Sequence, residues 1–172
     1  LRTRGYEVVL LSPPGDFQSL LQENGFQWIP FPLSRQGVNP FRELQTLWRL
    51  LRIYHRVKPE IVHHFTIKPV IYGSLTARIL GIKGIINSVT GLGHLFIDPG
   101  FGTRILRVLA KFLYRISLRH TQVVFENPED RSIFIENKFV QPEQSHLIPG
   151  TGVDVKRFQP VQGTNRIPII LF

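Results

Sequence analysis

The chain of 172 residues contains no cysteine, which excludes disulfide bonds, zinc sites with thiolate ligands and catalysis by a thiol nucleophile. No apolar run reaches the roughly 18 residues that a membrane-spanning helix needs, and the first residues show no signal-peptide pattern. Hydrophobic residues make up 42% of the sequence and charged residues 19%. This balance excludes a disordered chain and predicts one substantial core.

Acidic residues are scarce in the middle of the sequence. Residues 41–120 hold thirteen bases and three acids, a net charge of +10, whereas residues 1–40 and 121–172 are close to neutral. A basic region of this kind favours an anionic partner, which leaves nucleic acid, an acidic membrane surface and phosphorylated ligands open. Nucleic acid is the least favoured of the three, because the interleaved aromatic and basic residues of common RNA-binding sheets are absent.

Apolar runs alternate with helical patterns along the chain. Continuous apolar runs are typical of strands buried on both faces, and Asn-Pro pairs and glycines mark helix starts and ends. The sequence therefore predicts an α/β fold, a Rossmann-like parallel sheet with helices on both faces. Strands are expected over 6–12, 26–31, 60–65, 84–90, 122–126, 145–148 and 167–172. Helices are expected over 17–24, capped by Asp16, and over 39–57, 69–80, 103–120 and 127–138.

The loop TGLGHLFIDPGFG, residues 90–102, follows an expected strand at the edge of the sheet where open α/β proteins bind ligands. Gly91 and Gly93 would let backbone amides approach a ligand closely, and His94 offers a titratable group. The loop fits neither the dinucleotide fingerprint nor the Walker loop. A tight turn with a solvated histidine is the alternative interpretation.

Two histidines end the expected strand EIVHHF, residues 60–65. Their side chains must face opposite sides of the sheet, which argues against one shared metal ion. For His64, a hydrogen-bonded core histidine is the alternative to a binding role. Thr66 and Lys68 follow at the mouth of the next helix, where a hydroxyl and a cation suit a phosphate or a sugar hydroxyl. An ordinary N-cap beside a solvated lysine is the alternative there.

The helix expected over 103–120 is basic on one side. Its bases fall within an arc of about 120°: Arg104, Arg107, Lys111, Arg115 and Arg119. A second basic stripe follows the helix over 39–57. Two such helices predict contact with an anionic membrane, and a solvated basic face is the alternative. The carboxylates form no pair spaced for general acid and base catalysis, so spacing alone locates no catalytic residue.

Four segments resemble, in order and spacing, the N-terminal half of family 4 glycosyltransferases. They are HHFTIKPVIYGSLTARILGI (63–82), INSVTGLGHLFI (86–97), VVFENPEDRSIFI (123–135) and IPGTGVDVKRFQP (148–160). The resemblance is strongest to the bacterial enzymes that extend polyprenyl-diphosphate-linked sugars. It implies half of a GT-B architecture, in which the N-terminal domain handles the acceptor and the C-terminal domain binds the nucleotide-sugar. It also implies retention of configuration and no need for a metal or other cofactor.

The resemblance further implies that residues 1–160 form the acceptor domain without its first strand, and that residues 161–172 begin the donor-binding domain. The chain alone is therefore expected to be inactive. The residues expected to line the acceptor cleft are Thr90, Gly91, Gly93, His94, His64, Thr66 and Lys68, with His94 as the candidate catalytic residue. The crossing towards the second domain is expected at Asn127, Gly150, Gly152 and Asp154.

The intact parent is thus expected to transfer a hexose or N-acetylhexosamine from a nucleotide-sugar to a lipid-linked acceptor in surface polysaccharide or glycoconjugate assembly. It would lie in the cytoplasm, peripherally on the inner face of the cytoplasmic membrane, with the basic helix over 103–120 against the lipid. Two alternatives stay open: a nucleotide-sugar 2-epimerase of the same architecture, and a non-catalytic α/β module that binds a membrane or nucleic acid.

Overall fold

The computed structural model describes residues 2–33, 39–91, 101–150 and 152–159. Its strands are β1 (Val9–Ser12), β2 (Gln27–Pro30), β3 (Ile61–Phe65), β4 (Gly84–Val89), β5 (Gln122–Phe125) and β6 (Ser145–Leu147). Its α-helices are α1 (Gln18–Glu23), α2 (Pro40–Val57), α3 (Ile67–Ile79), α4 (Phe101–Ser117) and α5 (Pro128–Glu136), and two short 3-10 helices are η1 (Arg2–Arg4) and η3 (Pro142–Gln144). The expected strand over 167–172 lies outside the described residues.

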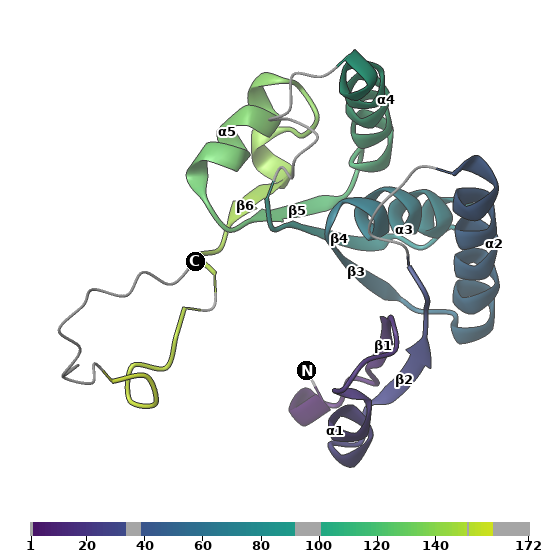
Figure 1. Ribbon diagram of the computed structural model, residues 1–172, viewed down its shortest axis with the longest axis vertical. Helices are drawn as coiled ribbons and strands as arrows, with labels where there is room; N and C mark the ends of the chain where they lie inside the picture. Colours follow the sequence, from purple (N-terminus) through teal and green to yellow (C-terminus); the bar gives the residue numbers. More distant parts are fainter. Residues whose placement is uncertain (1, 34–38, 92–100, 151, 160–172) are drawn as a thin grey trace, which may run out of the picture.

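The strands form two parallel sheets (Figure 1). One contains β1 and β2, and the other has the order β3-β4-β5-β6. The predicted α/β fold with parallel strands is confirmed. The strand expected over 6–12, which corresponds to β1, was expected in the same sheet as the later strands. That expectation is wrong, because β1 pairs with β2 and not with β3 among the described residues. Within the described ranges, one edge of β1 and one edge of β3 therefore have no strand partner.

The helices lie on two sides of these sheets (Figure 1). Helices α2, α3, α4 and α5 cover one face of the four-stranded sheet, where α3 packs between α2 and α4. Helix α1 lies on the far side of β1 and β2. The face of β3 that points away from α2 and α3 carries Ile61 and Phe65, whose side chains are both more than half exposed.

Asparagine caps set the start of two helices as predicted. The Asn39 side chain accepts hydrogen bonds from the backbone amides of Phe41 and Arg42, and Pro40 occupies the first helical position of α2. Asn127 caps α5 in the same way, accepting from the Asp130 amide at 2.7 Å. The expected cap of α1 by Asp16 is wrong, since α1 starts one residue later and has no side-chain cap.

The core has two apolar parts, both under the helix layer. The first joins α3, α4, β5 and α5 through edge-to-face aromatic contacts, with Phe134 lying 5.1 Å from Phe125 and 5.2 Å from Tyr114 between ring centroids. Such pairs add specific geometry to the hydrophobic stabilisation of burial. The second joins α2 to β3 and β4 through Leu50 and Val62, among others.

A buried polar network connects the two parts of the core. The Asn87 side-chain oxygen accepts from Ser74 Oγ at 3.0 Å and lies 2.8 Å from His64 Nδ1, while Asn87 Nδ2 donates to Thr121 Oγ1 at 3.1 Å. Since Asn87 Oδ1 can only accept, His64 Nδ1 carries the proton. His64 Nε2 therefore accepts from the Tyr54 hydroxyl, 2.9 Å away. The interpretation of His64 as a hydrogen-bonded core histidine is confirmed.

Gly73 lets α3 approach the His64 ring. A Cβ atom at position 73 would lie 2.4 Å from both Cδ2 and Nε2 of that ring, closer than any van der Waals contact allows. The backbone of α3 therefore packs directly against His64, and only glycine fits there.

We expect Gly73→Ala to lower the free energy of unfolding by about 1–3 kcal/mol, because overpacking at a rigid hydrogen-bonded ring outweighs the better helix propensity of alanine. Urea denaturation followed by circular dichroism measures the change. Gly15→Ala is the matched control, since a Cβ there meets nothing within 4 Å. An unchanged midpoint for Gly73→Ala would show that the ring moves aside freely.

Candidate functional site

A cavity of about 670 Å³ lies between β1 and β3, with α2 and the start of α3 forming its other walls. Most of its lining is aliphatic or aromatic. Polar groups gather where β3 ends and α3 begins, and His64, Thr66 and Lys68 of the predicted acceptor cleft all line it. Ligands of open α/β sheets bind beyond the carboxyl ends of the strands. This end of the cavity is therefore the candidate functional site.

Thr66 joins β3 to α3 in a backbone conformation that is rare for a threonine. Its φ of 68° and ψ of 164° fall in a region that is almost reserved for glycine, at a cost of about 1–3 kcal/mol. The Thr66 side chain makes no capping bond to α3. The chain is thus forced into a sharp turn at the cavity mouth, and strain of this kind is concentrated at binding sites.

Lys68 places its positively charged ammonium group at the first turn of α3. Its Nζ lies 2.6 Å from Glu43 Oε1, and the side chains of both residues are only 17% exposed. The Tyr72 hydroxyl is close to the same carboxylate, and burial together with Glu43 raises the pKa of Tyr72. The interpretation of Lys68 as a solvated lysine is therefore wrong, because it is fixed between α3 and the first turn of α2.

His64 contributes to the cavity wall as a neutral side chain. Burial lowers its pKa to about 4, and the positive charge that His63 can carry acts in the same direction, against the hydrogen bond to Asn87. His63 faces the other side of the sheet, as predicted, where its ring lies 4.2 Å from that of Phe65 and its Nε2 lies 2.8 Å from Ser88 Oγ. The contact between His63 and Ser88 was not predicted, because only strand pairing brings them together.

The other predicted cleft residues lie at the end of β4. Thr90 is exposed, and Gly91 has a φ of 147°, which favours glycine. Gly93 and His94, the candidate catalytic residue, lie outside the described residues.

The residues expected at the crossing towards a second domain do not line the cavity. Asn127 caps α5 and also donates from Nδ2 to Asp130 at 3.0 Å. Gly152 has a φ of 63°, a value that favours glycine, whereas Gly150 does not have a positive φ. The Asp154 side chain accepts from two backbone amides of the turn that follows it.

The basic stripe of α4 is partly tied to α5. Lys111 Nζ donates to the Asn137 side chain at 3.3 Å, and Arg115 donates to the Asn137 carbonyl at 3.0 Å. Arg119 is exposed, and the side chains of Arg104 and Arg107 lie outside the described part of the structure. Beside these bases, α4 exposes the apolar side chains of Val108, Leu109, Phe112 and Ile116.

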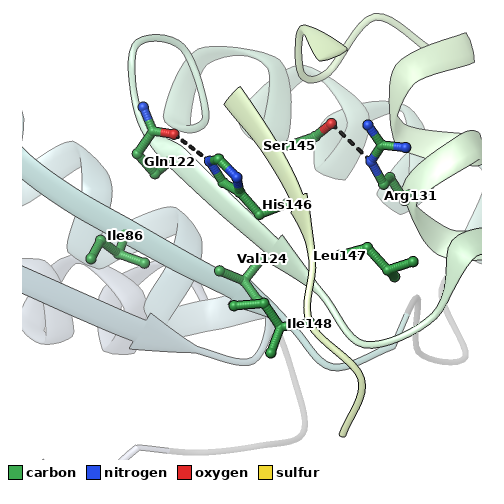
Figure 2. Close-up of a pocket in the computed structure, with 8 residues that line it drawn as sticks. All are labelled: Ile86, Gln122, Val124, Arg131, Ser145, His146, Leu147 and Ile148. Atoms are coloured by element: carbon green, nitrogen blue, oxygen red, sulfur yellow. Dashed lines mark hydrogen bonds between the residues drawn. The ribbon is translucent and has the colours of Figure 1, made fainter. Parts of the chain in front are cut away.

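A second hollow of about 640 Å³ lies along β5 and β6 (Figure 2). Its wall is mainly aliphatic, and its polar groups are paired with one another. His146 Nε2 lies 2.7 Å from Gln122 Oε1, and Arg131 Nε donates to Ser145 Oγ at 3.1 Å. Its polar groups do not converge on a common point, so this hollow is the weaker candidate. Sequence reasoning had not identified it.

Within the described ranges, no group of three His, Asp or Glu side chains could hold a metal ion. The helices of those ranges also include none long and apolar enough to cross a membrane.

The fold is that of part of two solved GT-B glycosyltransferases. MurG from Acinetobacter baumannii superposes with a TM-score of 0.55 at 18% identity, over 89% of this chain and 39% of MurG. A glycosyltransferase from Rickettsia africae superposes with a TM-score of 0.64, also at 18% identity, over 95% of this chain and 39% of its own. At this identity the likeness establishes the fold alone.

The chain belongs to the Glycosyl transferase 4-like family, which it matches over residues 1–127. It is 26% identical, over 94% of its length, to the N,N'-diacetylbacillosaminyl-diphospho-undecaprenol alpha-1,3-N-acetylgalactosaminyltransferase of Campylobacter jejuni. It is 25% identical, over 75% of its length, to an Escherichia coli UDP-Gal:alpha-D-GlcNAc-diphosphoundecaprenol alpha-1,3-galactosyltransferase. The chain spans 43% and 32% of these two relatives, less than half of each. The resemblance to family 4 is confirmed.

The lowered pKa of His64 predicts that the protein loses stability in acid. Unfolding returns the pKa of this histidine from about 4 to 6.5, so the unfolded chain binds the extra proton below pH 6.5. The stabilisation is complete above pH 6.5 and is lost as the pH falls to about 4, by roughly 3 kcal/mol.

Urea denaturation at a series of pH values measures this loss. The variant His64→Gln should flatten the profile between pH 6.5 and 4, whereas His146→Gln, which changes an exposed histidine, should keep it. A wild-type profile that is flat over this interval would contradict the assignment.

Proposed function

We propose that this chain is the acceptor-binding half of a glycosyltransferase that acts on polyprenyl-diphosphate-linked sugars. The observation that carries the proposal is family membership together with two curated relatives that are both named as undecaprenyl-diphosphate-dependent sugar transferases. A nucleotide-sugar donor would bind to a second domain beyond residue 160. The 2-epimerase and the non-catalytic module gain no comparable support.

The diphosphate of the acceptor would bind at the polar end of the cavity. The start of α3 presents the positive end of the helix dipole. Lys68 adds a full positive charge that is already positioned by Glu43. The strained turn at Thr66 brings the backbone to this point. These features support a site for an anionic group rather than for a neutral sugar alone.

The apolar part of the cavity would hold one more β-strand. Neighbouring strands lie 4.7–4.9 Å apart, and a strand parallel to β1 and β3 would pair with both free edges. It would unite the two sheets, in agreement with an acceptor domain over residues 1–160 that lacks its first strand. A helix following that strand would cover Ile61 and Phe65, which are exposed on β3. Unpaired, apolar strand edges are otherwise prone to aggregation.

The protein would associate peripherally with the inner face of the cytoplasmic membrane. The net charge of residues 41–120 and the exposed apolar side chains next to Lys111 and Arg115 on α4 support this placement. Arginine and lysine close to an anionic bilayer contribute about 1 kcal/mol each.

We expect the isolated chain to transfer no sugar and to bind UDP-sugars too weakly for calorimetry at micromolar concentrations. A longer form that includes the downstream domain should transfer sugar to a lipid-linked diphosphate acceptor, measured by radiolabel incorporation. Micromolar binding of a UDP-sugar to residues 1–172 alone would contradict the assignment of donor binding to a second domain, because the donor site would then lie within this chain.

Lys68→Gln should weaken binding of farnesyl diphosphate, used as a short acceptor probe, by about tenfold, since a charge-assisted contact to phosphate is lost. Calorimetry measures the dissociation constant. Glu43→Gln is the matched control: it removes the same ion pair but leaves the lysine, so binding should persist or strengthen. Equal weakening in both variants would show that Lys68 acts through its ion pair with Glu43, and no binding by the wild type would contradict a diphosphate site at this end of the cavity.

A further inference from the structure

Tyr72 lies at the candidate site, one helical turn after Lys68 on α3. A spacing of four residues places both side chains on the same face of the helix, and both line the cavity between β1 and β3. Burial raises the pKa of Tyr72, and the hydrogen bond of its hydroxyl to the Glu43 carboxylate acts in the same direction. The hydroxyl therefore keeps its proton at neutral pH and donates it to Glu43.

Glu43 thus receives two hydrogen-bond donors from α3. Lys68 Nζ lies 2.6 Å from Glu43 Oε1, and the Tyr72 hydroxyl is bonded to the same carboxylate. Helices α2 and α3 lie side by side (Figure 1), and Glu43 is in the first turn of α2, where the helix dipole favours a negative group. Among the described residues, Lys68 and Tyr72 line the cavity and Glu43 does not. The carboxylate therefore lies behind the two donors.

Glu43 and a bound diphosphate would compete for the ammonium group of Lys68. A charge-assisted bond to phosphate needs an N–H donor of this group. A carboxylate only 2.6 Å away cancels much of the attraction that the ammonium has for a second anion. The flexible four-carbon stem of lysine allows the ammonium to turn from one anion to the other. Binding of a diphosphate is therefore strongest when Lys68 moves away from Glu43.

Such a movement would leave a largely buried carboxylate without its cation. A buried charge that loses its partner is costly, unless other hydrogen bonds satisfy it. Tyr72 supplies such a bond, because its hydroxyl donates to Glu43 wherever the lysine points. Its ring is half-buried and turns about only two side-chain torsions. The tyrosine is therefore suited to stay with Glu43 while the lysine moves.

We propose that Tyr72 is a positioning residue of the acceptor site, whose hydroxyl holds the Glu43 carboxylate while Lys68 exchanges that carboxylate for the diphosphate of the acceptor. This inference rests on the proposed function, because it assumes a diphosphate at the start of α3. It deepens that function by assigning a residue that acts through Glu43 and not by touching the ligand.

A double-mutant cycle tests the proposal. Tyr72→Phe should weaken binding of farnesyl diphosphate about fivefold, since Glu43 then has no donor from Tyr72 when Lys68 leaves it. In a Glu43→Gln background the same change should alter the dissociation constant less than about twofold, because a neutral side chain needs no such compensation. Calorimetry of the four proteins measures the coupling. Inorganic diphosphate should give the same pattern, since the prenyl chain takes no part in it.

The cycle also separates positioning from stability. Both backgrounds carry the same Tyr72→Phe change, so a general loss of stability weakens binding in both and cancels in the coupling. Urea denaturation of each variant measures that loss independently. Tyr6→Phe is the matched control, because it removes the hydroxyl of an exposed tyrosine outside the cavity lining and should leave binding unchanged.

The outcomes distinguish this inference from the proposed function. Equal weakening by Tyr72→Phe in both backgrounds would show that Tyr72 contacts the phosphate directly or is purely structural, and would overturn its action through Glu43. An unchanged affinity in both backgrounds would overturn any part for Tyr72. In each of these cases the wild type still binds, and the diphosphate site stands. A wild type that binds neither probe would overturn the diphosphate site and this inference with it.

Discussion

The side chain of Asn87 is the point on which the described structure depends. Its side-chain amide lies in the middle of β4 and makes hydrogen bonds to His64, Ser74 and Thr121. These partners come from β3, α3 and the turn before β5, and His64 extends the network to Tyr54 on α2. Because an unsatisfied polar group in a dry core costs about 1–3 kcal/mol, each element is held in the position that completes the network. Apolar packing alone would tolerate sliding of α3 along the sheet.

The position of α3 follows from that network and sets the candidate site. Gly73 allows the helix backbone to touch the His64 ring, so α3 starts close to the end of β3. The short connection forces Thr66 into its strained conformation and directs the first turn of α3 into the cavity. Lys68 then reaches Glu43 and fixes the start of α2. One chain of contacts thus runs from a buried amide to a surface helix.

Local signals in the sequence predicted local structure well. The pairs Asn39-Pro40 and Asn127-Pro128 determine caps within a few residues, and the apolar runs identify strands whatever their partners. Non-local features were missed. Nothing around Thr66 signals a positive φ, since a β-branched residue argues against it. Helix α4 carries apolar residues around most of its circumference, so periodicity could not show that Phe112 is exposed while Tyr114 is buried. The separation of β1 from β3 likewise depends on pairing, which a single sequence does not reveal.

The gap between β1 and β3 and the polar end of the cavity are parts of the same space. A strand between β1 and β3 would fill the apolar gap with its own side chains, since sheets and helices pack to crystal-like density. It would leave the polar end unfilled, because the strands of a parallel sheet end before they reach the N-termini of the helices that follow them. With such a strand in place, most of the volume between β1 and β3 would be filled by protein, and the part left for a ligand would be the end defined by Thr66 and Lys68. Those two residues would keep their role whether or not the gap is occupied, because α3 and Glu43, not β1, hold them in place.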